Sequence, residues 1–140
     1  MSKVFWDTNL FVYLVEGNRP EAARVVELRR RMIERRDHLF TSALTLGEVL
    51  VKPIKSGDEV LAAQWQRAIS TSATVVPFSS DAAPVFARIR AERSIAAPDA
   101  IQLATAAVSG IDLFVTNDDR LSRCVVPGIQ FISSLERAFL

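Results

Sequence analysis

The sequence predicts an α/β domain in which helices cover both faces of a mostly parallel sheet of about five strands. Short segments rich in β-branched and aromatic residues alternate with longer segments whose apolar residues recur at helical spacing. Strands that alternate with helices form a parallel sheet covered on both sides. No repeat, low-complexity tract or long linker divides the 140 residues, so we expect residues 1–140 to form a single domain.

Five segments are predicted as strands because they are short and rich in β-branched or aromatic residues. In order they are Lys3–Trp6, His38–Thr41, Thr74–Phe78, Asp112–Thr116 and Ile129–Ile132. Two of them lead directly into acidic residues. The first strand ends at Asp7, and the fourth is followed by Asn117 and Asp118.

Between these strands the apolar residues follow a helical period. The predicted helices are Leu10–Val15, Glu21–Arg36, Leu44–Val51, Asp58–Ser70, Asp81–Arg93 and Pro98–Ser109, with a short one around Leu121. We expect Leu44–Val51 to stop near Pro53, because proline removes a helical hydrogen bond. Pro98–Ser109 begins with proline in its first turn and ends at Gly110, the preferred placement of these residues at helix ends.

The composition excludes several classes of protein. The 49% apolar and 24% charged residues are typical of a folded globular domain. Cys124 and His38 are the only cysteine and histidine, so neither an internal disulfide nor a Cys/His zinc site can form. No apolar run approaches the ~18 residues of a membrane span, and Asp7 interrupts any signal-peptide core. We therefore expect a cytoplasmic protein.

The basic residues are concentrated although the formal net charge is only +1. Arginine outnumbers lysine by 14 to 3, and residues 24–36 hold six arginines and two glutamates. Arginine is the better residue for bidentate contacts to phosphate. The simpler interpretation is a solvated helix face on which Glu27 pairs with Arg30 and Arg31.

Four acidic residues stand where a strand ends or a helix begins. Asp7 and Asp118 follow strands, and Glu48 and Asp99 lie in the first turns of helices. In an alternating α/β chain these positions meet along one edge of the sheet, where ligands bind. Carboxylates about 5 Å apart repel by roughly 3 kcal/mol per pair at an effective dielectric of about 20. A cluster of four is therefore expected to recruit cations or to stay partly protonated.

Each of these acids also has a local structural explanation. Asp7 can cap the following helix, and Asp99 suits the positive end of a helix dipole. Glu48 completes a capping box if Thr45 is the cap residue, but lies inside the helix if Ser42 is. The fourth acid stands in an Asn-Asp-Asp sequence that is common in turns. Only the joint placement of the four favours a functional site.

The side chains in this set favour a particular class of metal ion. Oxygen ligands without histidine or cysteine suit Mg²⁺ or Mn²⁺ rather than zinc. Mg²⁺ takes one or two carboxylates together with substrate phosphates. Such ions lower the pKa of an attacking water and stabilise charge on a phosphate. The set therefore predicts a metal site that cleaves phosphodiesters, with four catalytic and metal-binding candidates: Asp7, Glu48, Asp99 and Asp118.

The order and spacing of the motifs around these acids resemble the PIN-domain family. The resemblance spans essentially the whole chain, and the likeness is strongest to the VapC toxins of type II toxin–antitoxin pairs. It rests on Val4-Phe5-Trp6-Asp7-Thr8-Asn9, Leu44-Thr45-Leu46-Gly47-Glu48, Pro98-Asp99-Ala100 and Phe114-Val115-Thr116-Asn117-Asp118. It implies an α/β/α sandwich that cleaves RNA as an endoribonuclease.

The same resemblance implies a cofactor and partners. Mg²⁺ or Mn²⁺ would be bound by an acidic quartet, here Asp7, Glu48, Asp99 and Asp118. Thr116 and Asn9 would support the metal site, whereas Asp119 is left outside it. The partners would be an RNA substrate, a cognate antitoxin that blocks the acidic pocket, and a second copy in a homodimer.

If the chain is a nuclease, its arginines become candidates to follow the RNA backbone. They are those of the helix Glu21–Arg36 together with Arg88, Arg90 and Arg93. The rival role for the same surface is docking of the antitoxin or of the second protomer. The sequence does not separate these roles.

Two alternative functions belong to other classes. A non-catalytic PIN-like interaction module would keep the fold without binding metal. A phosphatase of the haloacid dehalogenase type also begins with a strand that ends in aspartate. That enzyme needs a second aspartate two residues later, where this chain has Asn9.

Overall fold

The computed structural model describes residues 1–138, and at its centre is a five-stranded sheet. The strands are β1 (Lys3–Trp6), β2 (His38–Ser42), β3 (Thr74–Val76), β4 (Ile111–Thr116) and β5 (Ile129–Ser134). Their spatial order is β3-β2-β1-β4-β5, and all neighbouring pairs are parallel. The predicted α/β class with about five parallel strands is confirmed. β3 ends earlier than predicted because Pro77 has no N–H to continue the ladder.

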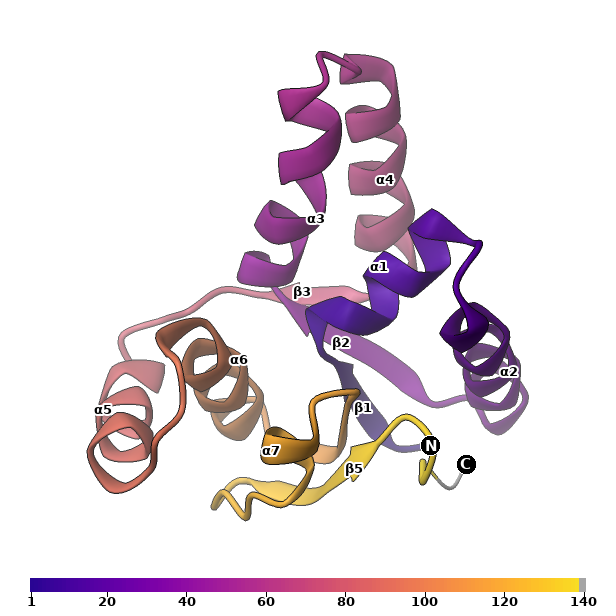
Figure 1. Cartoon of the computed structure of the whole chain (residues 1–140). Coiled ribbons are helices and arrows are strands. Elements are labelled where there is room, and N and C mark those ends of the chain that lie inside the picture. Colours follow the sequence, from indigo (N-terminus) through magenta and orange to yellow (C-terminus); the bar gives the residue numbers. More distant parts are fainter. Residues whose placement is uncertain (139–140) are drawn as a thin grey trace.

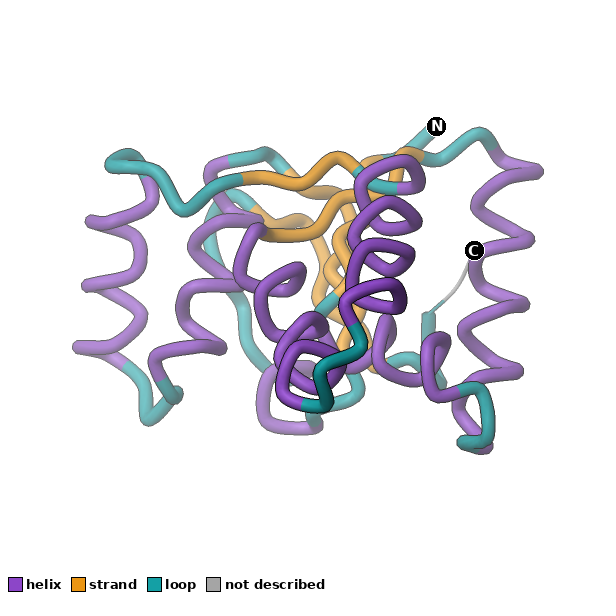
Figure 2. The backbone as a smooth tube through the Cα atoms, turned by 90° about the horizontal axis from the view of Figure 1, so that it is seen from above, coloured by secondary structure: helices purple, strands orange, loops and turns teal. Residues whose placement is uncertain are grey.

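Seven helices connect the strands within the described residues. They are α1 (Thr8–Glu16), α2 (Pro20–Arg35), α3 (Ala43–Lys55), α4 (Glu59–Ser72), α5 (Ala82–Glu92), α6 (Ala97–Val108) and α7 (Asp119–Ser122). Seen from above, the strands run through the middle of the molecule with helices on both sides (Figure 2). The α3–α4 hairpin projects away from the rest (Figure 1). None of the helices in residues 1–138 combines the length and apolar character needed to cross a membrane.

The central strand β1 contributes to the cores on both faces of the sheet. Val4 and Trp6 belong to the cluster that includes α1 and α2, whereas Phe5 belongs to the cluster that includes α5 and α6. Phe5 pairs with Phe114 of β4, and their rings stack with centroids 5.1 Å apart. Burial on both faces explains why β1 is a continuous apolar run.

Helix α3 is longer than the sequence predicts. The sequence predicts an end near Pro53, but the helix continues through this residue to Lys55. A proline costs a helix the hydrogen bond to the carbonyl four residues earlier. Here that loss falls in the last turn of the helix. The next residues restore the hydrogen bonding, since the N–H of Ser56 donates to the carbonyl of Lys52 at 3.1 Å. The structure therefore accepts the proline at little expense to the helix.

The strand order places a switch point between β1 and β4. From β1 the chain moves outward through β2 and β3, and it returns to pass on the other side through β4 and β5. Ligands in open α/β sheets bind at the carboxyl ends of the strands beside such a point. The residues that follow β1 and β4 are Asp7 and Asn117, so the predicted acids lie at this place in the fold.

Candidate functional site

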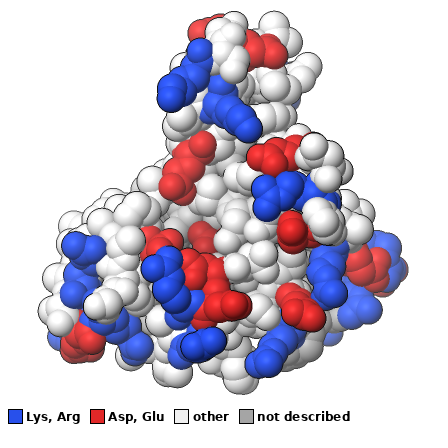
Figure 3. Space-filling view, in the orientation of Figure 1, with Lys and Arg blue, Asp and Glu red and all other residues white. Residues whose placement is uncertain are grey.

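A cavity of about 380 Å³ opens at the switch point. All four acids singled out from the sequence line it: Asp7, Glu48, Asp99 and Asp118. Figure 3 shows acidic side chains around a hollow near the middle of one face, at the base of the projecting hairpin. The fold thus brings together four carboxylates from the ends of two strands and from helices α3 and α6.

Asp7 is the deepest of the four, with 6% of its surface exposed. Its Oδ1 accepts the backbone N–H of Thr8 at 2.8 Å, and its Oδ2 accepts the hydroxyl of Thr116 at 2.8 Å. Burial raises the pKa of Asp7 to about 6; these hydrogen bonds oppose the rise, and the charges of Asp99 and Glu48 add to it. Asp7 therefore caps α1, as its local explanation predicts, and is also a carboxyl whose charge needs compensation.

Glu48 lies inside α3 rather than in a capping box. Ser42 is the cap residue, and its Oγ accepts the N–H of Thr45 at 3.1 Å. Of the two arrangements that the sequence leaves open, the structure adopts the one without a capping box. Glu48 reaches across the cavity wall instead, where its Oε1 accepts the hydroxyl of Thr8 at 2.7 Å.

Asp99 and Asp118 experience opposite environments. Burial raises the pKa of Asp99 in the first turn of α6, and the charges of Asp118 and Glu48 raise it further. Asp118 caps α7 and pairs with Arg120, whose Nη2 lies 3.0 Å from Oδ2 and whose Nε lies 3.3 Å from Oδ1. The hydrogen bonds from Arg120 lower the pKa of Asp118.

These carboxylates do not form a ready-made metal site. Within residues 1–138, no three acidic, histidine or cysteine side chains are grouped so that they could hold one ion. Two of the four carboxylates are engaged with other side chains, Glu48 with the Thr8 hydroxyl and Asp118 with Arg120. The donor set still fits a hard divalent cation, because all ligands are oxygens and the repulsion among them would be relieved by positive charge. Arg120 is 75% exposed, so the pair that would have to open is a weak surface ion pair.

The polar residues named beside the acids lie where the sequence suggests. The Thr116 hydroxyl donates to Asp7 and accepts the backbone N–H of Asp118 at 3.1 Å. Asn9 lines the cavity, and its Oδ1 is buried without a hydrogen-bond partner among residues 1–138. Asp119 lines a neighbouring hollow rather than the acidic cavity. It remains outside the candidate site.

Further polar residues of the cavity wall were missed in the sequence. Gln102 is 1% exposed and lies three residues after Asp99, on the same face of α6. Tyr13 accepts a hydrogen bond from Asn117 at 2.9 Å, and the guanidinium of Arg19 lies 5.2 Å from the centre of its ring. Helical spacing from Asp99 could have found Gln102. No signal in the sequence points to Arg19.

The arginines proposed to follow RNA are largely engaged with the protein itself. On α2 the predicted pairs exist, with Glu27 Oε1 lying 2.7 Å from Arg30 Nη2 and 3.2 Å from Arg31 Nε. These contacts confirm the solvated-face pairing. On α5, Arg90 donates to the carbonyl of Ile95 at 2.8 Å.

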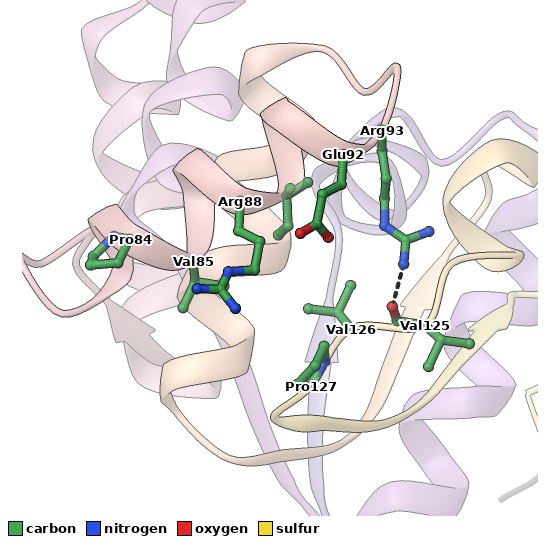
Figure 4. Close-up of a pocket in the computed structure, with 9 residues that line it drawn as sticks. Pro84, Val85, Arg88, Glu92, Arg93, Val125, Val126 and Pro127 are labelled. Carbon is green, nitrogen blue, oxygen red and sulfur yellow. Dashed lines mark hydrogen bonds between the residues drawn. The ribbon is translucent and has the colours of Figure 1, made fainter.

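A second, apolar cleft lies away from the acids, between α5 and residues 125–127 (Figure 4). Its volume is about 190 Å³. Arg88 lines it, and Arg93 closes one end by donating to the carbonyl of Val125 at 2.7 Å. No acid of the candidate site lines this cleft.

Comparison with known proteins identifies the family. A model of the family described as "PIN domain" matches residues 4–125, a span that contains all four acids. The chain belongs to the PIN-domain family. No curated protein sequence matches the chain.

Solved structures with the PIN fold cover nearly the whole chain. VapBC2 from Rickettsia felis, solved with a promoter DNA fragment, has a TM-score of 0.71 at 17% identity and covers 94% of this chain and 97% of its own. A toxin–antitoxin complex from Klebsiella pneumoniae has a TM-score of 0.67 at 24% identity, with 91% and 95% covered. VapC20 from Mycobacterium tuberculosis, a sarcin–ricin loop cleaving toxin, has a TM-score of 0.61 at 16% identity, with 80% and 87% covered. These similarities confirm the predicted α/β/α PIN fold.

The raised pKa of Asp7 predicts how stability changes with pH. A carboxyl whose pKa rises from 3.8 to about 6 on folding binds more protons folded than unfolded between these values. Stability from this group therefore falls as the pH rises through that window and stays low above it. Asp7→Asn is expected to raise the metal-free free energy of unfolding by about 2–3 kcal/mol above pH 6, and by less near pH 4.

Denaturant unfolding of the wild type and Asp7→Asn across this pH range measures the effect. Asp119→Asn, which removes an exposed acid beside the cavity, is the matched control and should leave the pH profile unchanged. If Asp7→Asn were the less stable protein at pH 8, the cap and its hydrogen bonds would outweigh the cost of the buried charge.

Proposed function

We propose that this PIN domain is a metal-dependent endoribonuclease and the toxin of a type II toxin–antitoxin pair. The observation that carries the proposal is the convergence of four carboxylates, one of them buried, in a single cavity at the switch point of the sheet. The PIN family match and the fold shared with toxin–antitoxin proteins support it.

Asp7, Glu48, Asp99 and Asp118 are the residues that would hold Mg²⁺ or Mn²⁺. When bound, such an ion lowers the pKa of an attacking water and stabilises the charge that develops on the phosphate. The protein prepares these ligands in different ways. Asp7 is oriented by two hydrogen bonds, whereas Asp118 is restrained by its ion pair with Arg120.

A phosphodiester that enters an acidic cavity meets repulsion, so cations of the protein matter for binding. Arg19 lines the cavity and is held against the ring of Tyr13, with ion pairs to Glu16 and Glu21 at 3.6 Å each. Arg120 stands beside Asp118 and interacts with the charge of Asp99. Both guanidinium groups can meet phosphate oxygens of the RNA, for which arginine geometry is suited.

We further propose a cognate antitoxin as the partner, a homodimer as the assembly and the cytoplasm as the location. Structures of toxin–antitoxin complexes with this fold support the first of these. The arginines of α2 and α5 stay candidates for contacts with RNA, antitoxin or a second copy.

A second candidate function is a non-catalytic interaction module. The observation that favours it is that residues 1–138 hold no preformed cluster for a metal ion. The two proposals differ in one measurable property, because the module would neither bind a divalent ion in the cavity nor require Asp99 for any activity.

Cleavage of a labelled total-RNA pool tests the nuclease proposal. Wild-type protein with Mg²⁺ or Mn²⁺ is expected to give discrete fragments, and a chelator or Asp99→Asn is expected to abolish them, because both remove the divalent charge from the cavity. Asp119→Asn is the matched control and should cleave like the wild type, since its carboxylate lies outside the cavity. Intact RNA with every metal, together with no metal-induced rise in melting temperature, would favour the interaction module.

Removing the competing cation is expected to strengthen metal binding. Arg120→Gln frees Asp118, so the dissociation constant for Mn²⁺ in isothermal titration calorimetry should fall a few-fold. Arg123→Gln removes the same charge next to the same short helix, but Arg123 lines the neighbouring hollow and serves as control. Equal effects of the two variants would mean that the change in affinity comes from the electrostatic potential of the cavity alone. The Arg120–Asp118 ion pair would then not limit the access of the metal ion to Asp118.

A further inference from the structure

Gln102 lies at a buried junction in the wall of the acidic cavity. Its Nε2 lies 2.7 Å from the hydroxyl of Thr45 and 2.9 Å from the hydroxyl of Thr8. Its Oε1 accepts the hydroxyl of Ser42, which also caps α3. One amide from α6 thus contacts side chains at the ends of β2, α1 and α3.

The hydrogen bonds in this network run in one direction. Thr8 has a single hydroxyl proton, and it points to Glu48 at 2.7 Å. In its 3.0 Å contact with Thr45, Thr8 must therefore be the acceptor. The amide protons of Gln102 go to the two threonine oxygens, because an amide nitrogen only donates. Ser42 thus donates to Gln102, and Gln102 donates to both threonines. Thr45 donates to Thr8, which in turn donates to the carboxylate of Glu48.

The same amide also faces the deepest acid. Gln102 Nε2 is 3.4 Å from Asp7 Oδ1, a long contact that adds orientation more than strength. Asp7 and Glu48 come from elements that are far apart in the sequence, and Gln102 lies between the groups that hold them. A buried polar network of this kind is most effective when every member is satisfied.

We propose that Gln102 is a positioning residue that sets the orientation of Glu48, through Thr8 and Thr45, for binding the divalent cation. This inference rests on the proposed metal-dependent function. Groups that orient metal ligands typically change metal affinity or activity by 10–100-fold when they are removed. Gln102 is too deeply buried to touch RNA, so its effect should appear in metal binding and kcat and not in KM.

Two substitutions separate this role from simple packing. Gln102→Met keeps the length of the side chain and removes every hydrogen bond. Gln102→Glu keeps the acceptor for Ser42 but places an acceptor where the donor stood, so the Thr8 hydroxyl should turn from Glu48 toward residue 102. Thr105→Val is the matched control, since Thr105 is fully buried on the same helix and does not line the cavity.

Three measurements decide the proposal: Mn²⁺ affinity by calorimetry, kcat and KM for RNA, and crystal structures of the metal-free variants. Both Gln102 variants are expected to bind Mn²⁺ about tenfold more weakly and to lose kcat to a similar degree, with KM unchanged. Thr105→Val should match the wild type in affinity even if its melting temperature falls. Variants of Gln102 that differ from wild type only in melting temperature would overturn the proposal.

The crystal structures keep the two proposals distinguishable. If wild-type protein bound no Mn²⁺, the proposed nuclease function would fail. The position of Thr8 would still decide the role of Gln102. A Thr8 hydroxyl that leaves Glu48 in Gln102→Glu supports positioning, and one that stays on Glu48 in both variants contradicts it.

Discussion

The buried carboxyl of Asp7 at the end of the central strand constrains much of what surrounds it. Thr116 from β4 and the start of α1 at Thr8 both hydrogen-bond to it, and each of these residues also contacts a neighbouring acid. The groups that satisfy Asp7 therefore also hold the carboxylate of Glu48 and the backbone of Asp118. A buried charge without such partners would be too costly to keep.

Burial, hydrogen bonds and mutual repulsion act against one another on the acids of the cavity. Asp7 and Asp99 have raised pKa values, because burial and neighbouring charges disfavour ionisation. Glu48 accepts a hydrogen bond from the Thr8 hydroxyl, and Asp118 pairs with Arg120. The cavity thus holds carboxylate oxygens whose mutual repulsion is only partly offset by hydrogen bonds and ion pairs within the protein. A divalent cation would relieve the repulsion and compete with Arg120 for Asp118.

Sequence reasoning found the acids because their positions depend on topology alone. In an alternating α/β chain, strand ends and helix starts share an edge, whatever the details of packing. Arg19 escaped because its place beside the acids depends on tertiary neighbours that no local spacing encodes, whereas the three-residue spacing from Asp99 could have indicated Gln102. Position along the chain also could not show that Pro53 would be tolerated near the end of α3, or that Ser42 would win over Thr45 as its cap. The carbonyl contacts of Arg90 and Arg93 were hidden for the same reason.

Anomalous scattering from a crystal soaked in Mn²⁺ shows where the ion binds and so tests the proposed metal site. We expect a peak inside the cavity lined by Asp7 and Asp99, and its loss in Asp7→Asn crystals soaked in the same way. No peak in the wild-type cavity, or a peak that survives in Asp7→Asn, would contradict the claim that this buried carboxyl anchors a metal site.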